Sequence, residues 1–286
     1  MGLIEPQNGS TPKPDISDPA FRRMAEKLQD ATGIVLNDSK KGLAISRLGR
    51  RLRQLGVPDF SAYCDLLEGP QGDCELQEMI LLLTTNVTRF FREGHHFTEL
   101  RDTILPACAE RVRRGGKLRI WSAGCSSGEE VYSLAMTILE VIPDANTLDV
   151  RVLGTDIDRN VIETARRAQY RLTDEDFAAS PLMRANMVSG GSAGGMSTPS
   201  DNVKSLVRFA RLNLLDSWPM QGRFDVIFCR NVVIYFSNET QEALWPRFAD
   251  AMIPGGHLMI GHSERVTGSA LSRLTSSGVT QYQLKP

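Results

Sequence analysis

Three short segments between residues 121 and 236 carry polar side chains of the types that hold a charged ligand. They are 121–130 (WSAGCSSGEE), 154–158 (GTDID) and 224–236 (FDVIFCRNVVIYF). In each, an apolar run passes into small or polar residues, which is the pattern of a strand that ends in a loop. Ligands of an open parallel sheet bind beyond the carboxyl ends of its strands. We therefore expect the three segments to meet at one ligand site.

The first segment combines a glycine turn with two acids. Gly124 and Gly128 would let the backbone approach a ligand closely, and Glu129 and Glu130 fall in the first turn of a helix. Two carboxylates there would repel the pyrophosphate of a dinucleotide. They suit a cationic ligand, such as the ammonium and sulfonium groups of S-adenosylmethionine. The alternative is that both acids only complement the helix dipole. No Gly-Lys-Ser/Thr follows, which excludes a Walker-type loop.

The other two segments contribute an acid and an arginine. Asp156 can accept hydrogen bonds from both ribose hydroxyls, whereas Asp158 is better placed to cap the next helix. Arg230 and Asn231 emerge after an apolar strand, and Tyr235 follows four residues after Asn231. An arginine here could orient a carboxylate through two hydrogen bonds or form a structural ion pair. For Tyr235 the alternative is core packing.

The elements that must position these residues belong to an α/β region. Up to about residue 90, apolar residues recur at helical spacing, as in Phe21, Met24 and Leu28, and no strand pattern occurs. From residue 117, strands alternate with helices, which predicts a parallel sheet covered on both faces. The expected strands are 118–122, 150–155, 206–211, 225–229 and 257–261, and the expected helices between them are 129–141, 160–168 and 240–252.

This change of pattern predicts the domain organisation. We expect a disordered tail at 1–17, a helical domain at 18–90 that begins with Asp18 as N-cap, and a linker helix at 91–116. A Rossmann-like, S-adenosylmethionine-binding domain follows at 117–286. Within it, an insertion at about 172–205 shows no clear helix pattern, and its glycine-rich stretch 189–202 predicts a flexible loop.

Composition excludes several classes of protein. The 286 residues include 33 Lys plus Arg and 34 Asp plus Glu, a net charge of −1 that argues against a general nucleic-acid binder. No apolar run approaches about 18 residues, so we expect no membrane insertion. Five cysteines without a Cys-x-x-Cys pair indicate a reducing cytoplasm. His95 and His96, on a surface helix, would point about 100° apart, so we expect no metal site.

The near-neutral total hides one basic segment. Six positive charges and no acid fall within residues 40–53, on a helix expected at about 39–55; they are Lys40, Lys41, Arg47, Arg50, Arg51 and Arg53. A solvated face is the ordinary interpretation of such a run. A merely soluble helix, however, would normally include acids at i,i+4 positions. We therefore favour docking of this helix on an acidic partner.

Six strings, in chain order, resemble the CheR-type chemotaxis-receptor methyltransferases. They are 85–93 (TNVTRFFRE), 121–133 (WSAGCSSGEEVYS), 155–158 (TDID), 213–215 (NLL), 228–231 with 234–236 (FCRN, IYF) and 261–264 (GHSE). The resemblance covers about residues 20–284. It implies an α/β fold class: a small N-terminal all-α domain followed by a class I (Rossmann-like) methyltransferase domain with an inserted small β-subdomain.

The resemblance also implies a function. It is S-adenosylmethionine-dependent methylation of glutamate side chains on the cytoplasmic helices of methyl-accepting chemotaxis receptors, with S-adenosylhomocysteine as product. We expect a cytoplasmic monomer without a nucleic-acid partner. A glutamate side chain titrates near about 4.3, so the acceptor is already an anion and needs no general base. The insertion lacks the compact glycine pattern of relatives that hold a receptor's C-terminal peptide, so we do not expect such tethering.

The site residues are assigned by matching positions. Those that resemble cofactor contacts are Asn86, Thr88, Arg92, Gly124, Glu129 or Glu130, Asp156, Asn213, Leu214, Arg230 and Asn231. Among them, Asp156 resembles the ribose ligand, and Asn213 and Leu214 resemble the adenine neighbourhood. The catalytic candidates are Arg92, Arg230 and Tyr235, and the receptor-contacting candidates are Arg47, Arg50, Arg51 and Arg53.

Three other functions compete with this interpretation. A methyltransferase for nucleic acids or small molecules would need an aromatic-proline motif or a general base, and Cys-Arg-Asn follows the fourth strand instead. A nicotinamide dehydrogenase conflicts with the two acids at the helix start. A non-catalytic cofactor sensor or scaffold is the third alternative.

Overall fold

The computed structural model describes residues 15–190 and 195–286, and the chain divides between Leu83 and Thr84 into two units. In the first unit the described elements are α1 (Asp18–Thr32), the 3-10 turn η1 (Asp38–Lys40), α2 (Lys41–Leu55), α3 (Phe60–Glu68) and α4 (Gly72–Leu83). The predicted apolar stripe of α1 is buried at Phe21, Met24 and Leu28. Packing of such stripes, rather than helix propensity, holds this unit together.

The start of α1 differs from the prediction by one residue. Ser17, not Asp18, is the N-cap, and its side chain accepts a hydrogen bond from the N–H of Ala20 at 3.4 Å. Asp18 instead pairs with Lys41 at 2.6 Å. Ile16, which we placed in the disordered tail, is buried because it is apolar and adjoins this helix. The rest of that predicted tail, as far as residue 14, lies outside the described residues.

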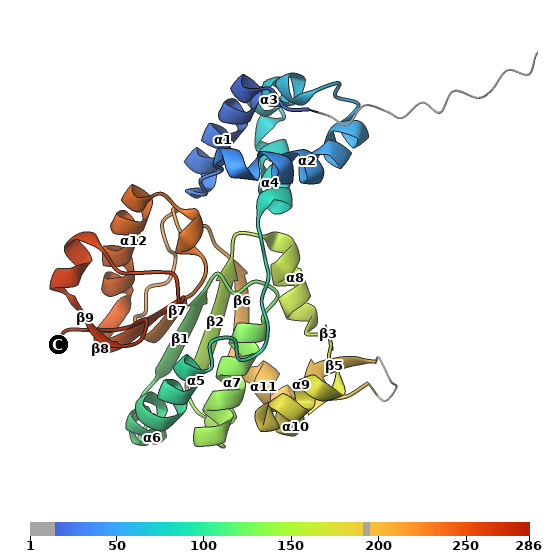
Figure 1. Cartoon of the computed structure of the whole chain (residues 1–286). Coiled ribbons are helices and arrows are strands. Elements are labelled where there is room, and N and C mark those ends of the chain that lie inside the picture. The colour runs from blue at the N-terminus through green and yellow to red at the C-terminus, as the bar shows by residue number, and fades with distance from the viewer. Residues whose placement is uncertain (1–14, 191–194) are drawn as a thin grey trace, which may run out of the picture. The chain divides into compact units, whose positions relative to one another are not determined.

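The second unit contains a sheet of seven strands within the described residues, in the order β6-β2-β1-β7-β8-β10-β9 (Figure 1). The strands are β1 (Leu118–Ala123), β2 (Val150–Asp156), β6 (Val207–Arg211), β7 (Phe224–Cys229), β8 (Met252–Ile260), β9 (Leu274–Gly278) and β10 (Gln281–Leu284). The first five are the predicted strands, and their pairings are parallel. We did not predict β9 and β10, which pair antiparallel. Most β9 residues are exposed and polar, so they give no apolar signal.

Two apolar cores flank the sheet. In β7, Val226 and Phe228 point into one core, and Ile227 and Cys229 into the other, as the two-residue period of a strand requires. The helices of this unit are α5 (His95–Glu99), α6 (Leu105–Arg113), α7 (Glu129–Val141), α8 (Arg159–Arg167), α11 (Asp201–Leu206) and α12 (Asn238–Ala251), with short turns η3 (Ala145–Thr147), η4 (Val233–Tyr235) and η5 (Gly268–Ser272). α7 contributes to the first core and α12 to the second (Figure 1).

The segment predicted as one linker helix contains an interruption. Between α5 and α6 the backbone forms a π-helical stretch, η2 (Leu100–Ile104). Pro106, in the first turn of α6, has no N–H to donate, which removes one regular helical hydrogen bond at this point.

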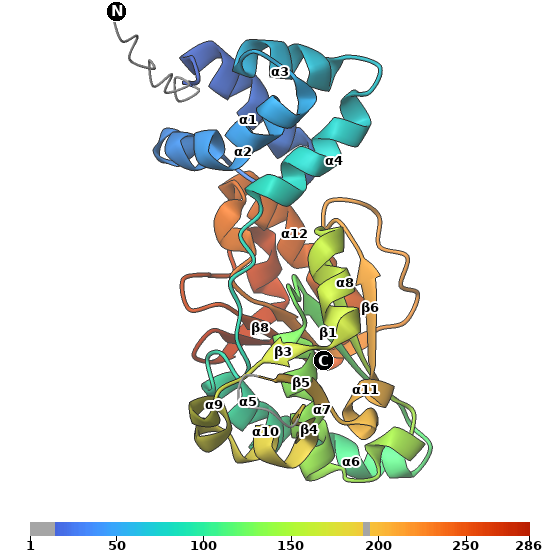
Figure 2. The ribbon, with the colours of Figure 1, turned by 90° about the vertical axis from the view of Figure 1, so that its right-hand side faces the viewer.

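The insertion has more regular structure than we predicted. It contains α9 (Asp174–Ala179), α10 (Pro181–Asn186) and a small antiparallel sheet of β3 (Tyr170–Arg171), β5 (Met196–Pro199) and β4 (Met187–Val188) (Figure 2). The prediction of no helix overlooked two local caps: a capping box between Thr173 and Asp176, and Ser180 before Pro181. Of the predicted flexible loop 189–202, residues 191–194 lie outside the described residues, and β5 occupies part of the remainder.

Candidate functional site

The three polar segments meet at the carboxyl ends of β2, β1 and β7, which are neighbours in the sheet. The loop after β1 is bonded to the end of β2, because the N–H groups of Gly124 and Cys125 donate to the carbonyl of Thr155 at 2.8 and 2.9 Å. The loop after β7 adjoins the same turn through Val232. A Cβ added at Gly124, whose φ is +93°, would lie 2.2 Å from Cγ2 of Val232. Gly124 therefore makes room for the side chain of Val232, a residue of this chain, and not for a ligand.

Glu129 and Glu130 begin α7 with different neighbours. Glu129 accepts a hydrogen bond from the hydroxyl of Ser127 at 2.7 Å. Glu130 accepts one from the hydroxyl of Ser122 at 2.7 Å, and its other oxygen lies 3.4 Å from Nη1 of Arg230. Burial raises the pKa of both carboxyl groups above the ordinary range. Glu130, unlike Glu129, therefore forms an ion pair with Arg230, another residue of the predicted site.

Asp158 caps the next helix as we predicted, while Asp156 occupies the end of β2, where we predicted a ribose contact. Asp156 is 8% exposed at the end of β2, and its two oxygens accept the backbone N–H groups of Ser126 and Asp158 at 2.9 and 3.0 Å. Burial raises the pKa of Asp156, and these amides oppose the rise. Each oxygen keeps a lone pair that a ribose hydroxyl could use. Asp158 caps α8 through the N–H groups of Asn160 and Val161.

Residues 84–94 form an irregular segment that is bound to this edge of the sheet. Asn86 donates from Nδ2 to Asp158 at 2.7 Å, and its carbonyl accepts the hydroxyl of Ser126 at 2.8 Å. Thr88 is half-buried in the same segment. Arg92 donates from Nη1 to the Val87 carbonyl at 3.0 Å. The structure thus brings Asn86 and the β2 acids together.

The backbone around Arg92 is strained. Phe91 and Glu93 both have left-handed φ values, +51° and +54°. Non-glycine residues pay roughly 1–2 kcal/mol for this conformation. Two contacts hold it: the N–H of Phe91 donates to the hydroxyl of Ser133 at 3.0 Å, and the carbonyl of Arg92 accepts a hydrogen bond from Nη2 of Arg230.

Arg230 is the centre of the site's charge network. Its side chain is 1% exposed, with Nη1 3.4 Å from Glu130 and Nε 3.8 Å from Glu93. Two carboxylates and one carbonyl therefore compensate the buried cation, which is the arrangement a desolvated charge requires. Neither Nε nor Nη1 has a hydrogen-bond partner among the described residues. Arg230 thus has donor capacity left for a ligand.

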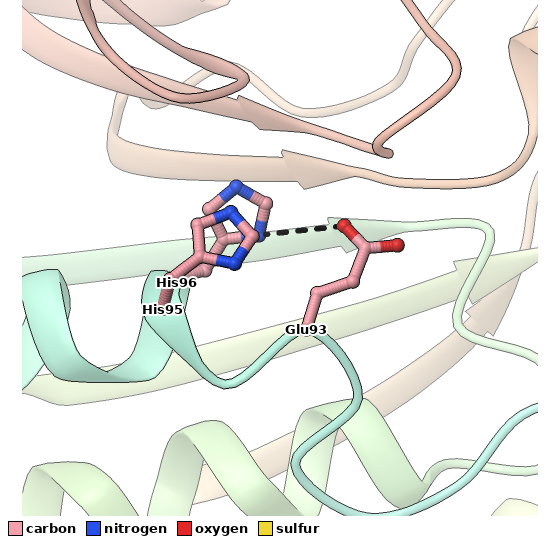
Figure 3. Close-up of side chains that lie close together, drawn as sticks. All are labelled: Glu93, His95 and His96. Carbon is pink, nitrogen blue, oxygen red and sulfur yellow. Dashed lines mark ion pairs between the residues drawn. The ribbon is translucent and has the colours of Figure 1, made fainter.

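Next to Arg230, Glu93 lies close to His95 and His96, and Figure 3 shows the three side chains. We expected both histidines on a surface helix with diverging rings. The exposed His95 agrees with this, but His96 does not: it is 0% exposed, and the two ring centroids are only 4.0 Å apart. The hydroxyl of Thr280, 2.9 Å from Nε2 of His96 and 3.4 Å from Nε2 of His95, holds them together. Burial, and then the charge of Arg230, lower the pKa of His96 to about 3.

This group of three side chains resembles a metal site in composition, since its ligand atoms lie within 4.8 Å of one another. Thr280 donates to the carbonyl of Val279, so it accepts from Nε2 of His96 and leaves Nδ1 as a lone pair. Nδ1 of His96 and Oε2 of Glu93 have no hydrogen-bond partner among the described residues. Nε of Arg230, which is a donor, also has none there. A cation would satisfy the two acceptors and repel the guanidinium. A ligand or water that both donates and accepts would satisfy all three atoms.

The remaining predicted residues lie at the rim. Asn213 accepts the N–H of Leu215 at 3.1 Å in a turn after β6, and Leu214 is buried. Their connection to the site is Leu212, whose N–H donates to the carbonyl of Asp156 at 2.9 Å. Tyr235 ends η4 and is only half-buried, so core packing does not account for it.

Two acids that contact Arg230 or the turn at Asn231 escaped prediction. Glu93 and Glu264 both stand in strings that resemble the family, but sequence alone did not assign either a role. The charge of Arg230 and a hydrogen bond from His262 at 3.2 Å outweigh burial and lower the pKa of Glu93. Glu264 accepts hydrogen bonds from the backbone of the Asn231 turn. Burial raises the pKa of the Cys125 and Cys229 thiols, which disfavours their thiolate forms.

In the first unit, the basic residues of α2 fall into two groups. Arg47 donates to the carbonyls of Leu82 and Leu83 at the end of α4, at 3.2 and 3.1 Å. Arg51 binds the buried carboxylate of Glu75 through Nε at 3.0 Å and Nη2 at 2.7 Å. Arg50 and Arg53 are exposed. Acids on other helices thus supply partners that the sequence of 40–53 lacks, so the absence of local acids was an incomplete argument for docking.

The strand order, the reversed strand β10 and the acids at the ends of β2 and at the start of α7 define the second unit as a class I methyltransferase domain. Residues 86–282 match the profile of the CheR methyltransferase SAM-binding domain, and residues 19–84 match that of the CheR methyltransferase all-alpha domain. The chain belongs to the CheR methyltransferase family. It is an enzyme of the chemotaxis methyltransferase type, and S-adenosylmethionine is its cofactor. The predicted fold class is confirmed.

Curated relatives match over most of their length. The chain is 46% identical over 255 residues to a probable chemotaxis protein methyltransferase of Rhizobium etli, covering 88% of this chain and 94% of the relative. It is 41% identical over 271 residues to the chemotaxis protein methyltransferase of Escherichia coli, covering 94% and 92%. The solved N-methyltransferase NodS from Bradyrhizobium japonicum is 15% identical over 68% of this chain and 100% of that one, with a TM-score of 0.34, which adds nothing to the assignment. Within the described residues, no helix combines the length and apolarity needed to cross a membrane.

Proposed function

We propose that this enzyme methylates glutamate side chains on the cytoplasmic helices of methyl-accepting chemotaxis receptors, in the cytoplasm and as a monomer. The relatives named above are chemotaxis protein methyltransferases. The observation that carries the proposal is Arg230, a buried guanidinium with Nε and Nη1 lacking hydrogen-bond partners among the described residues. Nη2 already donates to the carbonyl of Arg92, so Nε and Nη1 each remain to donate a single charge-assisted hydrogen bond, and this position suits a carboxylate of the acceptor or of the cofactor.

Contacts within the site support the roles proposed for Asp156 and Glu130. Asp156 would accept the ribose hydroxyls, and Glu130, which is joined to Arg230, is the better of the two acids for the methionine part. The segment with Arg92 would cover the cofactor. The remaining proposed contacts are Asn86, Thr88, Gly124, Asn213, Leu214 and Asn231, with Tyr235 at the wall near the methyl group.

The chemistry needs alignment and a dry site. S-adenosylmethionine supplies an electrophilic methyl group. An acceptor glutamate is anionic near neutral pH, so its oxygen can bond to the methyl carbon while the bond to sulfur breaks, and no proton moves. The products are a glutamyl methyl ester and S-adenosylhomocysteine. Two opposite charges disappear in this step, which exclusion of water favours. Arg92 and Arg230 would hold the reacting partners in line.

Docking of the receptor would use the first unit. Arg50 and Arg53 are exposed on α2, whereas Arg47 and Arg51 have partners within their own unit. We therefore assign the direct contact with an acidic receptor helix to Arg50 and Arg53, and a supporting role to the other two.

Transfer of a tritiated methyl group tests this function. The enzyme is incubated with labelled S-adenosylmethionine and a receptor cytoplasmic fragment, and the label is released with base. We expect base-labile label on the fragment and none on a fragment whose acceptor glutamates are alanine. The Asp156→Ala variant serves as the cofactor-site control and should transfer little. Base-stable label, or equal transfer to the alanine fragment, would exclude glutamate esterification.

A further inference from the structure

Glu264 is a buried acid that binds a run of backbone amides. It follows β8, is 2% exposed, and its carboxylate accepts hydrogen bonds from five N–H groups. Oε1 accepts from Val232, Val233 and Ile234 at 2.9, 3.0 and 3.4 Å, and Oε2 accepts from Asn231 at 3.1 Å and from Gly261.

These amides need an acceptor because of the local backbone. Asn231 has a left-handed φ of +59°, and η4 begins two residues later at Val233. The first N–H groups of a helical turn have no partner within it. A buried N–H without an acceptor costs roughly 1–3 kcal/mol. The Glu264 carboxylate, reaching in from the loop after β8, therefore acts as the cap that the turn itself lacks.

The packing around this carboxylate leaves no room for change. A Cβ added at Gly261 would lie 2.7 Å from the backbone nitrogen of Asn231 and 2.8 Å from Oε2 of Glu264. Val232, which belongs to the same turn, packs against the loop after β1. Its side chain fills the space beside Gly124. The position of the turn thus connects two loops of the cofactor site.

We propose that Glu264 is a positioning residue for the cofactor site: by holding turn 231–234, it places Arg230 before the turn, Asn231 at its start and Tyr235 after it. The inference rests on the proposed cofactor site but not on the identity of the methyl acceptor. Glu264 itself touches no reacting atom in this scheme. A carboxylate suits the position better than an amide, because both of its oxygens accept and neither donates.

Glu264→Gln tests the proposal with almost no change in volume. Its NH₂ group would face N–H donors that an oxygen now satisfies. We expect Kd for S-adenosylhomocysteine, measured by titration calorimetry on folded protein, to rise about tenfold or more, and KM for S-adenosylmethionine to rise with it. The control is Glu175→Gln, an exposed acid of α9, which should leave both constants unchanged.

A structural role alone predicts a different result. In that case Glu264→Gln would lower Tm while folded protein bound the ligand within about twofold of wild type, and the proposal would be overturned. If Glu264→Gln does not fold, Glu264→Asp, which keeps the charge but is one methylene shorter, is judged by the same criteria. Wild-type protein that binds S-adenosylhomocysteine but forms no glutamyl ester would contradict the proposed acceptor, while weaker binding by the variant would still support Glu264.

Discussion

The arginines of α2 and the arginine after β7 differ in how the chain treats their charge. Arg230 has a side chain that is 1% exposed, and Glu93, Glu130 and a backbone carbonyl surround it. Arg50 and Arg53 are exposed on α2. Electrostatic interactions are strong in a buried site. Between exposed charges, salt at physiological concentration screens them over a distance of about 8 Å. This difference fits the roles proposed for them: orientation of the reacting groups for the buried arginine, and encounter with the receptor for the exposed pair.

Replacement of the buried cation should have the largest effect. Arg230→Met leaves Glu93 and Glu130 without their compensating charge, and we expect the free energy of unfolding to fall by about 3 kcal/mol. Methyl transfer by the folded protein should fall by about 100-fold or more. Urea unfolding and tritium transfer measure the two effects. Arg223→Met, at an exposed arginine of the same unit, is the control. A variant as stable and active as wild type would remove the distinction between the two regions.

The neighbour of Arg230, His96, should make stability depend on pH. Its pKa is about 3 in the fold against an ordinary 6.5, so between these values the unfolded chain binds more protons at this residue. Stability therefore falls as the pH drops below about 6.5, and lowering the pH from 7 to 5 should remove about 2 kcal/mol. His96→Asn should flatten this part of the unfolding profile, and exposed His95→Asn should not. Parallel profiles for wild type and His96→Asn would contradict the assigned shift.

Arg92 should have an intermediate effect because it is partly exposed and stands on the strained backbone. We expect Arg92→Ala to reduce methyl transfer at least about tenfold, which is roughly 1.4 kcal/mol. Single-turnover transfer from labelled cofactor measures this, with circular dichroism to confirm folding. Arg89→Ala, in the same segment, is the matched control. Near wild-type turnover by folded Arg92→Ala would mean that the arginine has only a structural role.

Charge reversal on α2 should have the smallest effect and the strongest dependence on salt. With Arg50→Glu and Arg53→Glu together, we expect receptor methylation to slow about fivefold at low salt, and the difference to shrink at high salt. Affinity for S-adenosylhomocysteine should not change. The double reversal at exposed Arg113 and Arg114 makes the same change in net charge in the second unit. An equal effect of both double variants would argue against a docking role for α2.

Sequence predicted the regular elements whose local signals agree with their packing. Helix α7 has the predicted bounds of 129–141, because acids begin it and its apolar face is continuous. Strand β7 was found because it is buried along its whole length and mostly apolar, and edge strand β6 because apolar and basic residues alternate at its start. Strand β9 was missed because most of its residues are exposed and polar and are stabilised by pairing at the sheet edge. Strand β10 was missed because it has only four residues, two of which are glutamines. Helices α9 and α10 were missed because a cap, rather than apolar periodicity, starts each of them.

For the site, sequence could indicate which residues lie near one edge but not how their charges are compensated. The order of strands brings Asp156 and Arg230 to that edge, and strand patterns are visible in the sequence. The pairing of Arg230 with Glu93 joins residues far apart in the chain. The burial of His96 depends in the same way on Thr280, from the distant end of the chain. Such contacts leave no periodic pattern to read.

The division of the chain between Leu83 and Thr84 places the proposed docking residues and the buried charge network in different units. If α2 docks on the receptor as proposed, substitutions on this helix would alter the choice of receptor without disturbing a network whose members all belong to the second unit. Substitutions in that network affect several buried charges together, so single changes there are rarely neutral. A cell with several receptor types could therefore diversify copies of this enzyme through its first unit, while the methyl-transfer machinery stays fixed.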